Sequence, residues 1–301
     1  MKPIICVGHA ALDYVYRIEA FPPAPTKVRS LEHLESGGGM AANAAATIAR
    51  LGGEVELWSR TGGDSAGERI HKFLQADGVD TQFVRTFEHA RSSTSAVIVD
   101  RAGERLIVGE RDHAMPMDAS WLPLARIAGA AAVLSDLRWV EGTREAFIEA
   151  RAQGVPTLLD ADLGGGGMLA EFLCLADYAI FSGPALDAFA PALDERGQLA
   201  RVLAAGVRHA GVTRGAGGYS WLSQSGAAGH QPAFAVEIVD TTGAGDAFHG
   251  AFAWALANGR PPAECARIAA AAAALKCRRL GARAGLPTRA ELDEFLAARV
   301  D

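Results

Sequence analysis

The sequence predicts an α/β fold built on a mostly parallel β-sheet, with a second, smaller sheet beside it. Short, uniformly apolar runs, typical of strands buried on both faces, alternate along the chain with longer helical patterns. Residues 14–35 and 92–111 instead alternate polar and apolar side chains around turns, which is typical of antiparallel hairpins with one solvated face. Half of the 301 residues are apolar, enough for a large core. We therefore expect one domain over residues 1–301 that includes both hairpins.

The elements of the main sheet follow from the same patterns, taken in chain order. Apolar runs bounded by turn residues predict strands at residues 4–7, 55–59, 131–135, 157–159, 178–181, 211–213 and 219–222. Helical spacing predicts helices at residues 41–51, 66–76, 143–153, 198–205, 247–257 and 263–277. Gly52 and Gly259 follow two of these helices and Pro262 opens the last, as expected for helix ends and starts.

Composition excludes several classes of function. A net charge of −6 argues against a protein that binds nucleic acid or an anionic membrane, since binding to either requires a basic surface. The four cysteines form no Cys-x-x-Cys pair, which fits reduced thiols in a cytoplasm. The first residues run directly into a strand without a signal-peptide pattern, and the apolar runs are shorter than the roughly 20 residues that span a bilayer. We expect a cytoplasmic protein.

The most informative motif is VDTTGAGDAFHG at residues 239–250, where a strand gives way to a glycine-rich turn and an apolar helix. The small residues Gly243, Ala244 and Gly245 let backbone N–H groups converge at the helix N-terminus, where they can stabilise a phosphoryl group. A carboxylate in such an anion hole is costly unless it accepts a proton, so Asp246 is the expected general base. The alternative is a tight turn in which Asp246 only caps the helix.

Other nucleotide-binding motifs are missing from the sequence. None of the four lysines follows a glycine, so there is no Walker A loop. The protein-kinase pair His-Arg-Asp and Asp-Phe-Gly is absent. The glycine run at residues 37–39 precedes a helix but lacks the G-x-G-x-x-G spacing of a dinucleotide-binding fold.

Over nearly its whole length the chain resembles the PfkB, or ribokinase-like, family of carbohydrate kinases. Residues 240–250 match the family's C-terminal signature, and residues 37–45 resemble its N-terminal signature. The resemblance implies a ribokinase-like three-layer fold whose small sheet is a lid over the active site, and ATP-dependent phosphorylation of a sugar hydroxyl. Residues 6–13 and 135–139 look most like the ketohexokinase and sulfofructose kinase branch.

The resemblance also implies residues that bind the acceptor sugar. They are Asp13, Gly38, Gly39, Asn43, Lys27 and Arg138. A carboxylate at Asp13 can accept two hydroxyls, the glycines let the backbone approach the sugar, and the Asn43 amide can bond a further hydroxyl. Alternatively, Asp13 and the glycines serve turns, and Asn43 lines a helix. Lys27 and Arg138 would favour a sugar with an anionic far end, or are solvated surface charges.

For the nucleotide, the resemblance places the turn with Thr213, Gly215 and Gly218 against the ATP phosphates and ribose. Ala270, Ala274 and Cys277 lie near one face of a predicted helix, and their small side chains leave room for adenine. An ordinary hairpin and helix packing explain these residues equally well.

Two cations belong to the same implied site. The family's Asn-x-x-Glu motif for magnesium is absent near residues 180–185, so we expect Asp160 to act on Mg²⁺ through water. A potassium ion is a further candidate, held by Asp240, Thr242 and the backbone of residues 279–285.

The function expected from the sequence is phosphorylation of the primary hydroxyl of a ketose or an anionic ketose derivative, with ATP and Mg²⁺. The alternatives are a ribose or nucleoside kinase on the same fold and a sugar-binding regulator without turnover. Retention of Asp246 speaks against the regulator. The apolar face expected for the lid suggests a homodimer that pairs through it.

Overall fold

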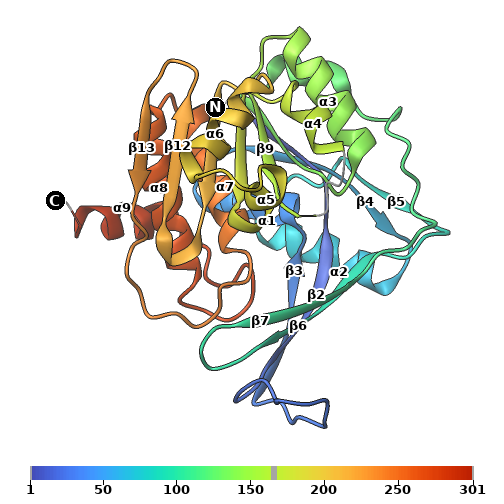
Figure 1. Ribbon diagram of the computed structural model, residues 1–301. Helices are drawn as coiled ribbons and strands as arrows, with labels where there is room; N and C mark the ends of the chain where they lie inside the picture. Colours follow the sequence, from blue (N-terminus) through green and yellow to red (C-terminus); the bar gives the residue numbers. More distant parts are fainter. Residues whose placement is uncertain (1, 164–167, 300–301) are drawn as a thin grey trace.

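A nine-stranded sheet forms the centre of the computed structural model, which describes residues 2–163 and 168–299 (Figure 1). The strand order is β13-β12-β11-β10-β9-β8-β1-β4-β5, and every neighbouring pair is parallel except β11–β12 and β12–β13. Its strands are β1 (Ile4–Val7), β4 (Val55–Gly62), β5 (Val84–Phe87), β8 (Ala132–Asp136), β9 (Thr157–Ala161), β10 (Tyr178–Ser182), β11 (His209–Thr213), β12 (Tyr219–Ser223) and β13 (Ala228–Gln231). The predicted parallel sheet is confirmed.

Helices cover both faces of this sheet, because its strands are apolar on both sides. Along β1, Ile4 and Cys6 join one hydrophobic cluster, whereas Ile5 and Val7 join the other. The first cluster packs against α1 (Met40–Arg50), α2 (Ser65–Ala76), α7 (Ala244–Ala257), α8 (Pro262–Lys276) and α9 (Arg289–Ala297). The second packs against η1 (Leu124–Gly129), α3 (Val140–Ala152), α4 (Leu169–Leu173), α5 (Gly183–Phe189) and α6 (Glu195–Ala204).

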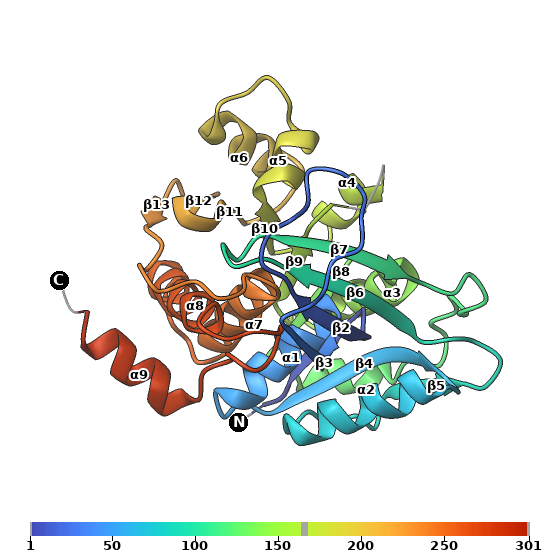
Figure 2. The same ribbon diagram turned by 90° about the horizontal axis from the view of Figure 1, so that it is seen from below.

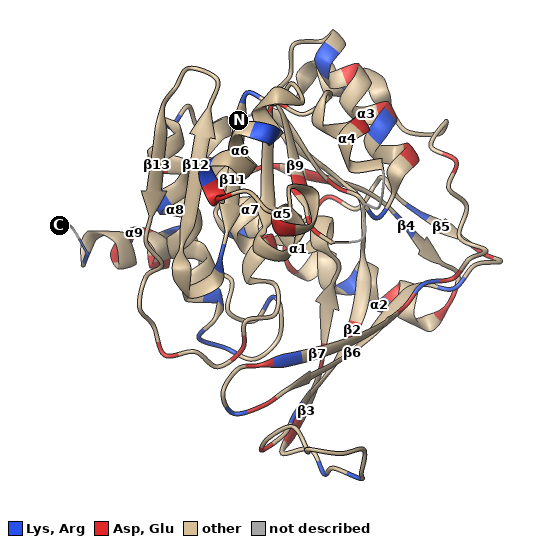
Figure 3. Cartoon of the chain, in the orientation of Figure 1, with Lys and Arg blue, Asp and Glu red and all other residues tan. Residues whose placement is uncertain are grey.

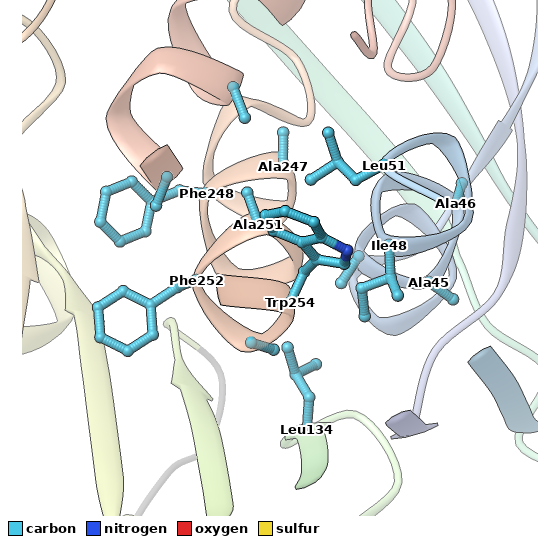
Figure 4. Packing of buried hydrophobic residues seen from close by; sticks show 14 of the residues in the cluster. Ala45, Ala46, Ile48, Leu51, Leu134, Ala247, Phe248, Ala251, Phe252 and Trp254 are labelled. Atoms are coloured by element: carbon cyan, nitrogen blue, oxygen red, sulfur yellow. The ribbon is translucent and has the colours of Figure 1, made fainter. Parts of the chain in front are cut away.

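Helices α1 and α7 lie side by side because small residues line their contact. Figure 4 shows Ala45 and Ile48 of α1 on one side of Trp254, with Ala251 beside it on α7. A Cβ atom at Gly250 would lie 2.5 Å from the Ala44 carbonyl oxygen, so the helices can approach this closely only with glycine there. This packing brings the N-terminal turns of the two helices together.

The second sheet has four strands and stands off the main sheet (Figure 2). Its order is β3-β2-β6-β7, formed by β2 (Ala11–Arg17), β3 (Glu32–Gly38), β6 (Ser93–Val99) and β7 (Arg105–Glu110). The pairs β2–β3 and β6–β7 are antiparallel, as residues 14–35 and 92–111 predicted, and β2 and β6 join them in parallel. We call this sheet the lid.

Basic and acidic segments are interspersed along the helices and loops in Figure 3. Within the described ranges, no helix is long and apolar enough to cross a membrane.

Candidate active site

The predicted site residues gather where the parallel strands end. Strand β1 is flanked by β4 on one side and β8 on the other, so the connections diverge there. In open α/β sheets, ligands bind at such a point on the carboxyl edge, and we call this place the crevice. This edge carries the loop before Asp13, the N-termini of α1 and α7, and the ends of β8, β9 and β10.

The acceptor side is formed by the lid and the start of α1. Asp13 lies on β2, is buried, and pairs in register with Ser36 of β3. A Cβ atom at Gly38 would lie 2.3 Å from the Asp13 carboxylate, so only glycine fits beside this side chain. Gly39 is the N-cap of α1, and a Cβ atom there would lie 2.5 Å from the His9 carbonyl oxygen. The carboxylate and the backbone of the glycine run therefore lie close to one another, while their contacts with a sugar stay predictions.

Asn43 links the acceptor side to the expected base. Its Nδ2 donates to Asp246 Oδ2 at 2.7 Å, which joins the first turns of α1 and α7. The Asn43 Oδ1 accepts from Arg283 Nε at 2.8 Å, and Arg283 also donates to the Gly38 carbonyl oxygen and pairs with Asp77. Arg283 is buried and fixes which way the Asn43 amide points. The sequence analysis missed this residue, because it lies 240 positions from its partner.

The start of α7 is where the sequence predicts an anion hole. Gly243 is the N-cap in a left-handed conformation with φ of 75°, and no side chain of the described residues caps this helix. The peptide N–H groups at Gly245 and Asp246 therefore open toward the site at the positive end of the helix. The helix-cap alternative for Asp246 is not what the structure shows, since its carboxylate bonds Asn43 instead.

The carboxyl groups of Asp246 and Asp13 both have raised pKa values. Burial raises the pKa of Asp246 to about 6, against the lowering effect of its bond to Asn43. Burial likewise raises the pKa of Asp13 to about 6, while Ser95 and Arg283 oppose the shift. A carboxylate with a pKa near 6 is ionised at pH 7 yet basic enough to accept a proton from a hydroxyl, so the Asp246 side chain suits general-base chemistry.

Asp136, a residue that the sequence analysis left without a role, organises the crevice. Its Oδ2 accepts from the backbone N–H groups of His9 and Ala41, and its Oδ1 accepts from the N–H of Arg138. These three bonds tie the ends of β1 and β8 to the start of α1. Asp136 is fully buried, so it acts as a scaffold for the pocket.

Three arginines lie close enough to His9 for their charges to affect its titration. The pKa of His9 is lowered to about 3, mainly by burial. The positive charges of Arg111, Arg138 and Arg60 lower it further. Arg60 lies over the Trp139 ring at 4.4 Å, and Arg138 is 3.9 Å from Asp162. We call Arg60, Arg111 and Arg138 the arginine cluster. Lys27, in contrast, is exposed in the loop between β2 and β3, and its predicted role stays a prediction.

The predicted nucleotide residues lie on β11, the turn that follows it, and α8. Thr213 ends β11, and the turn η3 (Gly215–Gly217) leads through Gly218 into β12. Ala274 and Cys277 lie at the C-terminal end of α8, where each keeps a small exposed fraction of 8–9%. The structure thus puts both groups on elements near α7, while their contacts with a nucleotide stay predictions.

For magnesium, no cluster of three or more metal-ligating side chains exists among the described residues. Asp160 is buried 3.5 Å from His249, and burial and Asp246 raise its pKa well above the ordinary range. Asp162, which the sequence analysis did not consider, accepts from Ser182 at the end of β10, where the missing motif was expected. Asp162 is 39% exposed in its side chain, so these residues fit an ion that keeps most of its water and phosphate ligands.

A monovalent cation fits this site poorly. Asp240 and Thr242 are both buried, and Thr242 Oγ1 has no partner among the described residues, which favours an ion. However, Lys276 Nζ lies 2.7 Å from the Asp240 carbonyl oxygen and 4.0 Å from Asp240 Oδ2. Two positive charges about 4 Å apart repel by roughly 4 kcal/mol at an effective dielectric of 20. Asp240 therefore already faces a cation that belongs to the chain.

The protein has a three-layer α/β fold, an open helix N-terminus and, beside a group of buried polar side chains, a carboxylate of raised pKa. Together these features define a small-molecule kinase. The sequence model of the pfkB family of carbohydrate kinases matches residues 1–289, and the chain belongs to this family. The protein is a sugar kinase, a phosphotransferase whose acceptor group is a hydroxyl.

Similar proteins are mostly ribokinases. The chain is 29% identical to the ribokinase of Bacillus subtilis over 300 residues, which cover 99% of this chain and 100% of that one. The crystal structure of a candidate ribokinase from Agrobacterium tumefaciens superimposes with a TM-score of 0.94 at 36% identity, covering 99% and 98% of the two chains. Arabidopsis thaliana ribokinase complexed with ribose and ATP has a TM-score of 0.85 at 28% identity and covers 98% of each chain. Membership of the ketohexokinase and sulfofructose kinase branch, which the sequence suggested, is not specifically shown.

Proposed function

We propose that this protein transfers the γ-phosphoryl group of ATP to the primary hydroxyl of ribose or a closely related sugar. The observation that carries the proposal is the Asn43–Asp246 hydrogen bond. It holds the carboxylate of Asp246, the expected base, beside the open N-terminus of α7. The ribokinase names among the similar proteins favour ribose over the ketose expected from sequence.

In this reaction, different residues of the chain bind the sugar, accept the proton and stabilise the transferring group. Asp13 and the Gly38–Gly39 backbone bind hydroxyls of the sugar and point its primary hydroxyl at Asp246. Asp246 accepts the proton as the hydroxyl oxygen bonds the γ-phosphorus and the bond to the ADP oxygen breaks. The open N–H groups of Gly245 and Asp246 stabilise the charge on the transferring group, whereas the Ala244 N–H, which the sequence predicted to join them, already donates to the Thr241 carbonyl oxygen. The lid excludes water, which would otherwise compete for the phosphoryl group.

Magnesium, when bound with ATP, neutralises phosphate charge and aligns the transferring group. Asp160 and Asp162 would hold water molecules of that ion, since neither belongs to a direct ligand cluster among the described residues.

A second candidate function is phosphorylation of a sugar that already carries an anionic substituent. The arginine cluster favours it, because three guanidinium groups lie close enough to His9 to affect its titration. A charge-assisted hydrogen bond from such a group contributes about 1.5–3 kcal/mol when shielded from water. An anionic acceptor should therefore be preferred over its neutral analogue by roughly 10- to 100-fold in kcat/KM.

A panel of acceptors tests both functions. ADP formation is measured with ribose, fructose, nucleosides, phosphorylated sugars and a sulfonated ketose, for the wild type and Arg138→Met. Ribose turnover that is unchanged in the variant supports the first function. Selective turnover of anionic sugars that is lost in Arg138→Met supports the second, and equal wild-type rates on anionic and neutral sugars would exclude it.

Pairing of two copies through the lid also stays a proposal. Strand β7 exposes Leu106, Ile107 and Val108, with 50%, 48% and 60% of their surfaces accessible. Apolar residues on an edge strand favour a covering partner, and a second copy offers a matching edge. Light scattering of the wild type and Ile107→Glu tests this proposal. If both proteins are dimers, two copies do not pair through the lid.

A further inference from the structure

Lys276 is a charged side chain with no exposed surface and no part in the proposed mechanism. It ends α8, and its Nζ donates to the Asp240 carbonyl oxygen at 2.7 Å. A buried ammonium is costly unless it is paired and hydrogen-bonded. Among the described residues, the carboxylate that forms an ion pair with it is that of Asp240, whose Oδ2 lies 4.0 Å away. This side chain therefore needs a structural or functional reason.

Asp240 connects this ammonium to the loop that builds the anion hole. One carboxylate oxygen accepts from the Thr242 N–H at 2.8 Å, and the other accepts from the Gly281 N–H at 2.8 Å. Two residues beyond Asp240, the chain turns through Thr242 into Gly243, the N-cap of α7. Lys276 thus supports the first residue of the loop that orients the phosphoryl-binding N–H groups.

We propose that the Lys276 ammonium is the built-in cation of this loop, so that the kinase needs no monovalent metal ion. A tethered cation has the same two tasks as a bound one: it balances the Asp240 carboxylate and orients a carbonyl oxygen beside the anion hole. Because Nζ already lies within hydrogen-bond distance of that carbonyl, an added ion has no vacant position beside it. Lys276 is a positioning residue, since it acts through Asp240.

The contacts around the end of α8 also agree with the proposed role of Lys276 as a built-in cation. A Cβ atom at Gly285 would lie 2.2 Å from the Lys276 carbonyl oxygen, so the C-terminal loop closes tightly over the end of α8. The Cys277 carbonyl oxygen accepts from the N–H groups of Val239 and Asp240, which holds the two segments together. These contacts seal the ammonium from water.

The first experiment uses the wild type and compares potassium, sodium and tetramethylammonium chloride at one ionic strength, with ATP as its tetramethylammonium salt. We expect kcat to differ by less than about 2-fold among the three, because the cation is part of the chain. Activation by potassium of 5-fold or more would overturn the proposal. Thermal unfolding in the same salts gives a second readout, and a melting temperature that rises selectively with potassium would also overturn it.

Variants separate the charge from the packing. Lys276→Ala leaves room for an ion, and we expect kcat to fall about 10-fold or more and to recover with potassium or methylammonium but not tetramethylammonium. Lys276→Met fills the space without a charge and should be equally slow without recovery. Lys72→Ala, at an exposed lysine on α2, is the control and should behave as the wild type.

Full activity of Lys276→Ala without added cation, or a loss that no small cation relieves, would contradict the proposal. If the alanine variant does not fold, the comparison of kcat and melting temperature of the wild type in the three salts still decides it. The rate readout rests on the proposed sugar-kinase reaction, whereas the melting readout does not. A protein that phosphorylates no sugar yet melts identically in all salts would therefore refute the proposed function and leave this inference standing.

Discussion

Replacing Asp246 by asparagine should cost activity and gain stability. The amide keeps an oxygen to accept from Asn43 Nδ2, so the local bond survives while the base is lost. Without a proton acceptor, kcat should fall by roughly 10²-fold or more while ATP binding stays near that of the wild type.

The stability gain follows from the pKa of Asp246, which burial raises from 3.8 to about 6. Because the folded protein holds this proton more tightly than the unfolded chain, ionising Asp246 destabilises the fold as pH rises from about 4 to 6. At about 1.4 kcal/mol per pKa unit the ceiling is about 3 kcal/mol, and partial exposure reduces the expected gain to about 1–2 kcal/mol. Asparagine avoids this cost.

Urea unfolding at pH 7, 5 and 4 measures the difference in the free energy of unfolding between wild type and Asp246→Asn. The variant should be the more stable at pH 7, and its advantage should shrink as the pH falls. A variant that is no more stable at pH 7, or that keeps turnover within about 3-fold of the wild type, would refute the reasoning.

Three further predictions address the same pocket. Asp13→Ala should raise the acceptor KM sharply and the ATP KM little, because the substrate hydroxyls lose their acceptor; an equal rise in both constants would indicate a folding defect instead. Arg283→Met should lower kcat/KM for the sugar by about 10-fold by freeing the Asn43 amide, whereas Arg289→Met on α9 should change it little. The kcat/KM profile should rise with pH through about 6 and level off above, since Asp246 must be ionised; a profile flat down to pH 4.5 would contradict its role.

The main sheet and its helices were predictable because their signals are local. The buried strands are uniformly apolar, and the predicted helices begin and end within about three residues of the observed ones. Strand β5 was missed because Arg85 and Thr86 interrupt its apolar pattern at the sheet edge. Helix α9 was missed although Thr288 and Glu291 form a capping box, which is a local signal that the sequence does carry.

The candidate site divides in the same way. Asp246, Asn43 and the glycine runs were predicted from motifs whose residues are contiguous, and the structure brings them together. Arg283 was not, because an arginine in a C-terminal loop looks like a surface charge until the fold places it beside Asn43. Likewise, Lys276 looked like an ordinary lysine in the last turn of a helix, and only tertiary packing reveals its burial.

The most direct test of the central claim is transfer of radioactive phosphate from γ-labelled ATP to sugar by the purified protein. With ribose and Mg²⁺, we predict one labelled sugar phosphate for each ADP formed, phosphorylated at the primary hydroxyl, and none with Asp246→Asn. Release of inorganic phosphate without a labelled sugar, or transfer by the asparagine variant at the wild-type rate, would contradict the account.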